Sequence, residues 1–333
     1  MKKRIYEIDL IRTICCIGII VYHFACHTAS NLCVLKNTVN SNIGEIIVTV
    51  FFIVSGFVLY HSNKEITSLK KFYWKRFKSI FPSFYLCWFI FYVINVIKVR
   101  TPFYAGNPLK LLLTLIGQDG YTQLRIVNYY TVGEWFLGAL IIVYALYPLL
   151  LKLHKKNSNL TLLMLIALTS IVHLCDIPVI SPGFPGICEC CLKFYIGILM
   201  YEQINNINKT VMLSSIVYVI VYSIININFI NTVLDIIYSI CIFIILYKLS
   251  SNIIGENKLI SFIAGISYQI FLLQHMVINY SLGFHNPIAM FPSILMMLLC
   301  ICLTAVFAYF IKKIDKTIVN SKLFKKMDNL FLE

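Results

Sequence analysis

The apolar residues of this chain are gathered into long segments that are separated by short polar stretches. Ten segments of about 16 to 21 residues follow one another, and each could cross roughly 30 Å of hydrocarbon as a helix. A backbone in hydrocarbon must satisfy its own hydrogen bonds, so helices are expected. The pattern predicts an all-α, polytopic integral membrane protein with about ten transmembrane helices in one bundle. The predicted spans are residues 8–28, 43–61, 79–97, 133–151, 158–175, 187–203, 210–225, 233–249, 260–280 and 291–311.

The segments between the predicted spans differ in character. Residues 62–79 form a basic loop with interleaved aromatic residues, and the apolar stretch 109–117 is too short to cross a membrane. The C-terminal tail, residues 312–333, alternates basic and apolar residues, which predicts a cytoplasmic amphipathic helix on the membrane surface. No linker composition interrupts the chain, so we expect one domain over residues 1–333, without an appended extracytoplasmic domain.

Composition and charge agree with a membrane protein. Of 333 residues, 59% are hydrophobic and 13% are charged, whereas soluble domains carry about 25% charge. A net charge of +14 could indicate a nucleic-acid partner, but the basic residues are concentrated on one side of the predicted spans. Of the 28 Lys and Arg, 21 fall in the segments predicted to be cytoplasmic, and five fall in outer loops. This bias predicts a multi-pass protein of the plasma (inner) membrane bilayer with both termini cytoplasmic. We expect no nucleic-acid partner.

Two basic side chains lie in the first predicted span. Arg12 and His23 are eleven residues apart, almost three helical turns, and therefore project from one face about 16 Å apart along the axis. Ionisable groups inside a bilayer normally face partners, water or substrate. His23 is alternatively a core histidine that bonds a neighbouring helix, and Arg12 could simply pair with Asp9, three residues earlier.

Further candidates lie later in the chain. His275 is about fifteen residues into its span and so reaches a depth similar to that of His23. Glu134 opens the fourth span, where a carboxylate could raise the basicity of a histidine, or could be an ordinary interfacial residue. Ser55 is followed by glycine, and this pair of small residues favours a close helix contact over a nucleophilic serine. The cysteine run at 188–191 lacks the paired spacing of a zinc site, so no metal is expected.

Five motifs in the same order together resemble those of acyltransferase family 3, and they span nearly the whole chain. They are EIDLIRTICCIGIIVYHF, with Arg12 and His23; IIVTVFFIVSGFVLY, with Ser55; FYWKRFKSIFPSFY, with Lys75, Arg76, Lys78 and Pro82; GEWFLGALIIVYALYPLL, with Glu134 and Tyr144; and SYQIFLLQHMVI, with His275. One difference concerns the arginine pair that many members carry before the proline, because Ser79 holds the second position here.

The resemblance implies a membrane O-acyltransferase that moves acetyl from cytoplasmic acetyl-CoA to a hydroxyl of a cell-surface or lipid-linked polysaccharide. It implies catalytic roles for His23, Glu134 and His275. It also implies donor binding by Arg12, Ser55, Lys75, Arg76 and Lys78. The alternative is a transporter or flippase that moves a glycan or acyl substrate without catalysis. A structural scaffold would leave Arg12 and His23 unexplained. The acceptor sugar, the acyl chain and the oligomeric state stay open.

Overall fold

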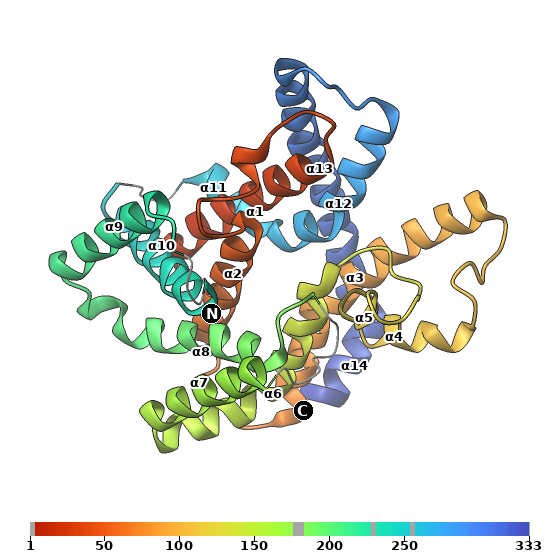
Figure 1. Cartoon of the computed structure of the whole chain (residues 1–333). Coiled ribbons are helices and arrows are strands. Elements are labelled where there is room, and N and C mark those ends of the chain that lie inside the picture. The colour runs from red at the N-terminus through yellow and green to blue at the C-terminus, as the bar shows by residue number, and fades with distance from the viewer. Residues whose placement is uncertain (1–3, 176–182, 228–230, 254–256, 333) are drawn as a thin grey trace. The chain divides into compact units, whose positions relative to one another are not determined.

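The computed structural model describes residues 4–175, 183–227, 231–253 and 257–332 (Figure 1). Within these ranges the chain forms helices and short 3-10 turns, with an isolated bridge between Asn37 and Asn42 and no strand. The all-α expectation is confirmed. Contacts divide the chain into two compact units: unit 1 is Met1–Ser62 with Ile196–Ala308, and unit 2 is Asn63–Tyr195 with Tyr309–Glu333. One domain over the whole chain stays a prediction.

The long first helix organises unit 1. Helix α1 (Tyr6–His27) packs against α2 (Ile43–Ser62), α10 (Asn231–Ile253), α11 (Lys258–Gly265) and α12 (Ser267–Phe284), and Figure 1 shows α2, α11 and α12 beside it. The remaining elements of the unit are η1 (Cys33–Leu35), the end of α8 (Ile187–Gln203), η3 (Ile204–Asn206), α9 (Lys209–Ile224) and most of α13 (Met290–Val319).

The predicted span 260–280 is not one straight helix. It breaks at Ile266 into α11 and α12, which are bent by 67°. At the break, the amide of Ile266 donates to the carbonyls of Phe262 and Ile263 in the last turn of α11. Helix α1 contacts the chain on both sides of the break: the Thr13 hydroxyl donates to the carbonyl of Ile260 at 3.2 Å, and the Cys16 thiol to that of Ser267 at 3.7 Å. The helix that carries His23 is therefore bonded to both α11 and α12.

Unit 2 is built from α3 (Leu69–Val99), η2 (Pro108–Lys110), α4 (Leu111–Leu115), α5 (Asp119–Thr122), α6 (Glu134–Lys156), α7 (Ser158–Leu174), the start of α8, the end of α13 and α14 (Lys322–Leu332). Much of the predicted loop 62–79 is helical, because α3 begins at Leu69. The Ser68 side chain accepts from the amide of Lys71, and Phe72 and Trp74 are buried. The N-cap and two buried aromatic side chains explain the early start.

Helices match all ten predicted spans, but their lengths differ. Six described helices are long and apolar enough to cross a membrane: α1, α2, α3, α6, α10 and α13. The number is seven if α11 and α12 together form one span. Helices α7 and α9 are apolar and shorter, at 17 and 16 residues. The short segment α4 has five residues. The protein is thus an all-α membrane protein, and ten crossings stay a prediction.

Candidate active site in unit 1

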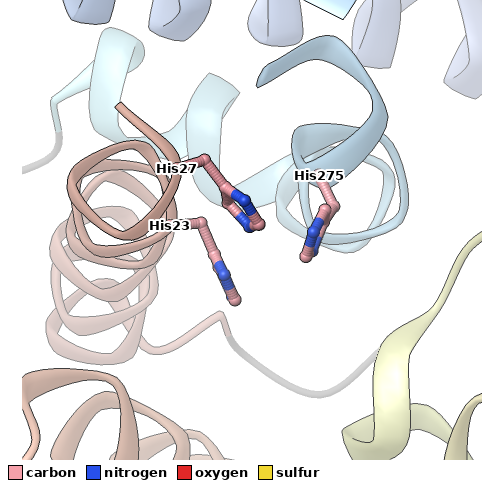
Figure 2. Close-up of side chains that lie close together, drawn as sticks. All are labelled: His23, His27 and His275. Carbon is pink, nitrogen blue, oxygen red and sulfur yellow. The ribbon is translucent and has the colours of Figure 1, made fainter. Parts of the chain in front are cut away.

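The structure brings together the two histidines that the sequence singled out. His23 lies on α1 and His275 on α12, and their ring centroids are 5.0 Å apart. Both side chains are partly buried. Although the two residues are 252 positions apart in the sequence, the packing of α12 on α1 places their imidazoles side by side, with ring planes tilted by 47° (Figure 2). Their roles in catalysis stay a prediction.

A third imidazole joins this pair. His27, for which the sequence predicted no role, lies one turn beyond His23, and its ring centroid is 4.8 Å from that of His275. Figure 2 shows the three rings lying close together. The His-x-x-x-His spacing on α1 was the available signal, because residues four apart share a helix face.

Arg12 lines a cavity at the beginning of α1. The cavity has a volume of about 340 Å³, and its lining includes Arg4, Asp9, Arg12 and His61. His61, for which the sequence predicted no role, comes from the end of α2, and its Nδ1 lies 3.1 Å from the hydroxyl of Tyr201. The site therefore presents cationic and hydrogen-bonding groups beside a space that could hold part of an anionic ligand.

The alternative that Arg12 pairs with Asp9 is wrong. The Asp9 carboxylate pairs with Arg4, which also donates to the carbonyl of Ser261 at 2.7 Å. Asp9 belongs to the first turn of α1, and Arg4 lies just before the helix, so Arg4 can fold back onto that turn. Among the described residues no carboxylate pairs with Arg12. Its guanidinium thus keeps its hydrogen-bonding capacity for a ligand.

The cavity and the histidine cluster are separate features of unit 1. The described lining of the cavity includes Arg12 but neither His23 nor His275. The predicted polar path along α1 between Arg12 and His23 stays a prediction. Ser55 is a partly buried residue of α2, and its part in donor binding also stays a prediction.

The other predicted site residues belong to unit 2. Lys75 is exposed on α3, and the guanidinium of Arg76 lies over the ring of Tyr144, with its centre 5.9 Å from the ring centroid. The Nε of Arg76 is buried and has no hydrogen-bond partner among the described residues. Lys78 pairs with Asp328 of α14. Arg76 and Tyr144 come from two different family-like motifs, and this contact joins them.

Glu134 opens α6 with an unusual backbone. Its φ is 41°, and the preceding Gly133 has a φ of 93°, so the chain enters the helix through a left-handed turn. Asp119, which sequence reasoning missed, is buried. It lies next to this turn in space: a Cβ added to the following residue, Gly120, would lie 2.3 Å from the carbonyl oxygen of Glu134. Burial raises the pKa of Asp119 to about 7. This carboxyl therefore titrates near neutral pH.

The tail helix α14 packs on the basic half of α3. The Asp328 carboxylate accepts hydrogen bonds from Lys78 and from the indole of Trp74, the latter at 2.7 Å. The rings of Phe331 and Trp74 are stacked, with centroids 4.8 Å apart. The predicted amphipathic tail is indeed helical, and one face of it covers part of the surface that the sequence assigned to the acyl donor.

The bonds to Asp328 make the docking of α14 depend on pH. Hydrogen bonds from Lys78 and Trp74 hold the pKa of Asp328 below its usual range. A lowered folded-state pKa stabilises docking above the ordinary carboxyl pKa, and this contribution is lost as the pH falls through the lowered value. We expect Asp328→Asn to expose the tail to proteases at neutral pH and to remove this acid dependence. The measurement is the rate of limited proteolysis against pH.

The control for this prediction is Lys325→Gln, because Lys325 is exposed on the same helix and its replacement changes the charge while leaving Asp328 in place. Its tail should be cleaved at the wild-type rate. Equal cleavage of the wild type and Asp328→Asn at neutral pH would contradict a docking role for the carboxylate.

Fold and site together define an all-α membrane protein whose first long helix carries a histidine site. The model of the family described as Acyltransferase domain matches residues 5–313, so the chain belongs to this family. The resemblance to acyltransferase family 3 is confirmed. The chain is similar to Acyltransferase MdmB of Streptomyces mycarofaciens, at 26% identity over 175 residues. This match covers 50% of the chain and 45% of the relative, less than half of that protein. No solved structure matches the chain.

Proposed function

We propose that this protein is an integral membrane O-acyltransferase that transfers acetyl from cytoplasmic acetyl-CoA to a hydroxyl of a cell-surface or lipid-linked polysaccharide. The observation that carries the proposal is the convergence of His23 and His275 within a chain of the acyltransferase family. Both residues belong to family-like motifs, and they come from opposite ends of the sequence. The relative named for acyltransferase activity supports the reaction class.

His23 is the proposed general base. Its imidazole takes the proton of the acceptor hydroxyl while the hydroxyl oxygen attacks the thioester carbonyl carbon. The C–S bond then breaks, coenzyme A leaves as a thiolate, and the proton is returned to it. His275, with its ring 5.0 Å from that of His23, orients the base or holds the proton during the step. The partly buried setting of both rings limits competing attack by water.

Arg12 and the basic half of α3 are the proposed donor contacts. Coenzyme A carries several phosphates, and a guanidinium can grip one of them with two parallel hydrogen bonds. The buried, unpartnered Nε of Arg76 fits such a phosphate. Lys75 is exposed and available as a point charge, whereas Lys78 is held by Asp328 and would contact the donor only when α14 releases it. For Glu134, of unit 2, the catalytic role implied by the family motif is kept as part of the proposal.

The proposed location is the plasma membrane, with both termini in the cytoplasm. The bias of Lys and Arg toward the predicted cytoplasmic segments supports this orientation. It would place the cation-rich segments of α3 and α14 in the compartment that holds acyl-CoA.

The test uses the purified full-length protein in detergent with acetyl-CoA and a saccharide acceptor. Release of the coenzyme A thiol should depend on acceptor, and mass spectrometry should find the acceptor heavier by one acetyl group. Turnover of acetyl-CoA without an acylated product, or no turnover at all, contradicts the proposal. Transport of the glycan across vesicles without acylation would instead support the transporter alternative. Envelope glycans from cells with and without the gene would identify the natural acceptor.

Arg12→Lys should lower the efficiency of acyl transfer, measured as kcat/KM for acetyl-CoA, by about 10- to 100-fold. Lysine keeps the charge but loses the two-pronged geometry, and a hydrogen bond to a charged group is worth about 1.5–3 kcal/mol. The matched control is Arg100→Lys, since Arg100 is exposed at the end of α3. An unchanged efficiency in Arg12→Lys would mean that Arg12 is only a structural cation.

A further inference from the structure

We infer that His23, His27 and His275 form a binding site for a divalent transition-metal ion of the zinc, copper and nickel class. Their ligating nitrogens all lie within 4.8 Å of one another. Figure 2 shows the three rings lying close together, two from α1 and one from α12. The sequence predicted neither a role for His27 nor a metal, so the third imidazole enters the cluster only through the tertiary structure.

Two helices hold the three imidazoles in place. His23 and His27 are one turn apart on α1, and this spacing puts two nitrogens on one side of a metal. Hydrogen bonds on both sides of the cluster hold His275, the third ligand, beside α1. Beyond the cluster, the Asn286 side chain accepts from the amide of Ala29 at 2.8 Å. Before it, the thiol of Cys16 donates to Ser267 at 3.7 Å.

Small ring movements convert this arrangement into a metal site. A Zn–N bond of about 2.0–2.1 Å requires tetrahedral ligand nitrogens about 3.3 Å apart. The widest separation must therefore close by at most about 1.5 Å, a distance on the scale of a side-chain rotation. His27 is exposed, and His23 and His275 are partly buried.

The ligand set selects the kind of ion. Three neutral imidazole nitrogens suit zinc, copper and nickel, whereas magnesium and calcium require oxygen ligands, and the described cluster contains none. Three protein ligands leave a fourth position for water. The exposure of His27 provides access from solvent on one side of the cluster.

Metal binding opposes the proposed function, and this part of the inference rests on that function. A coordinated His23 gives its lone pair to the metal and cannot accept the proton of the acceptor hydroxyl. We therefore expect zinc to inhibit acyl transfer reversibly. His27, which has no place in the proposed proton transfer, makes the enzyme sensitive to the ion because it completes the chelate.

The binding test uses the purified full-length protein after treatment with a chelator. Dialysis against Zn²⁺ followed by elemental analysis should find one zinc per chain, and Co²⁺ should give the visible absorption of a tetrahedral ion. His27→Ala should weaken zinc binding by at least about 10-fold. Loss of a residue that only hydrogen-bonds a metal ligand already costs about 10- to 100-fold, and His27 is proposed as a ligand itself. His285→Ala is the matched control, because His285 is exposed at the end of α12. Equal affinity in His27→Ala and wild type overturns the site.

The activity test separates the inference from the proposed function. Each variant is compared with its own metal-free rate, and zinc should inhibit the wild type and His285→Ala but much less His27→Ala. Stimulation by zinc would overturn the antagonism. If the protein has no acyltransferase activity, the binding measurements alone still decide whether the metal site exists.

Discussion

Replacement of His23 by alanine is expected to lower the rate of acyl transfer by about 100- to 10,000-fold, the range that a positioned general base contributes. Without the imidazole, the acceptor hydroxyl loses the group that takes its proton during attack on the thioester. The residue is partly buried on α1 and its ring faces His275, so the substitution removes one side of the proposed pair. The measurement is acceptor-dependent release of coenzyme A by purified protein.

Two controls show whether the loss is chemical. His285→Ala removes an exposed histidine at the end of the helix that carries His275, and it should transfer acetyl at the wild-type rate. Thermal unfolding in detergent should be similar for His23→Ala and the wild type, because the core of α1 is formed by apolar residues such as Ile19, Ile20 and Phe24. A folded His23→Ala protein with full activity would remove the base from the mechanism.

Gly197→Ala is expected to destabilise unit 1 by about 1–3 kcal/mol or more, the cost of overpacking a tight core. A Cβ at this position of α8 would lie 2.0 Å from the carbonyl oxygen of Ile53 and 2.8 Å from the amide nitrogen of Phe57. Both atoms belong to the backbone of α2, so no side chain can rotate away. Small residues allow helices to approach this closely inside a membrane. The measurement is the midpoint of thermal unfolding in detergent.

The same crossing positions part of the Arg12 cavity. Past Gly197, the Glu202 carboxylate accepts from Tyr60 at 2.7 Å, and the Tyr201 hydroxyl lies 3.1 Å from Nδ1 of His61. Spreading α2 from α8 would shift His61, which lines the cavity with Arg12. We therefore expect Gly197→Ala also to raise the KM for acetyl-CoA.

Gly283→Ala is the matched control for the helix crossing. Gly283 lies near the end of α12, and a Cβ there would meet no atom within 4 Å. Alanine is favoured over glycine in a helix by about 1 kcal/mol, so this variant should be as stable as the wild type or more so. If Gly197→Ala unfolds at the same temperature as Gly283→Ala, the close approach of α2 and α8 does not contribute to stability.

Much of the architecture followed from local properties. Long apolar segments predicted the helices, because a membrane-length apolar stretch buries its backbone groups most simply as a helix. The motifs around Arg12, His23 and His275 predicted the family, which the match over residues 5–313 confirmed. Helix ends were less predictable: the basic stretch before Ser79 became part of α3, since the Ser68 cap and buried Trp74 extended the helix.

The sequence by itself determined an all-α membrane protein of the acyltransferase family and singled out two histidines as candidates for its chemistry. The length of apolar segments, the charge bias and the order of motifs are properties of the linear chain, so they do not depend on tertiary contacts. Only the tertiary structure decided what these residues touch. Arg4 rather than Arg12 took Asp9, and His27 joined His23 and His275. It also decided that side chains of α1 donate to both α11 and α12. These outcomes depend on contacts between segments up to about 250 residues apart, which no local periodicity encodes.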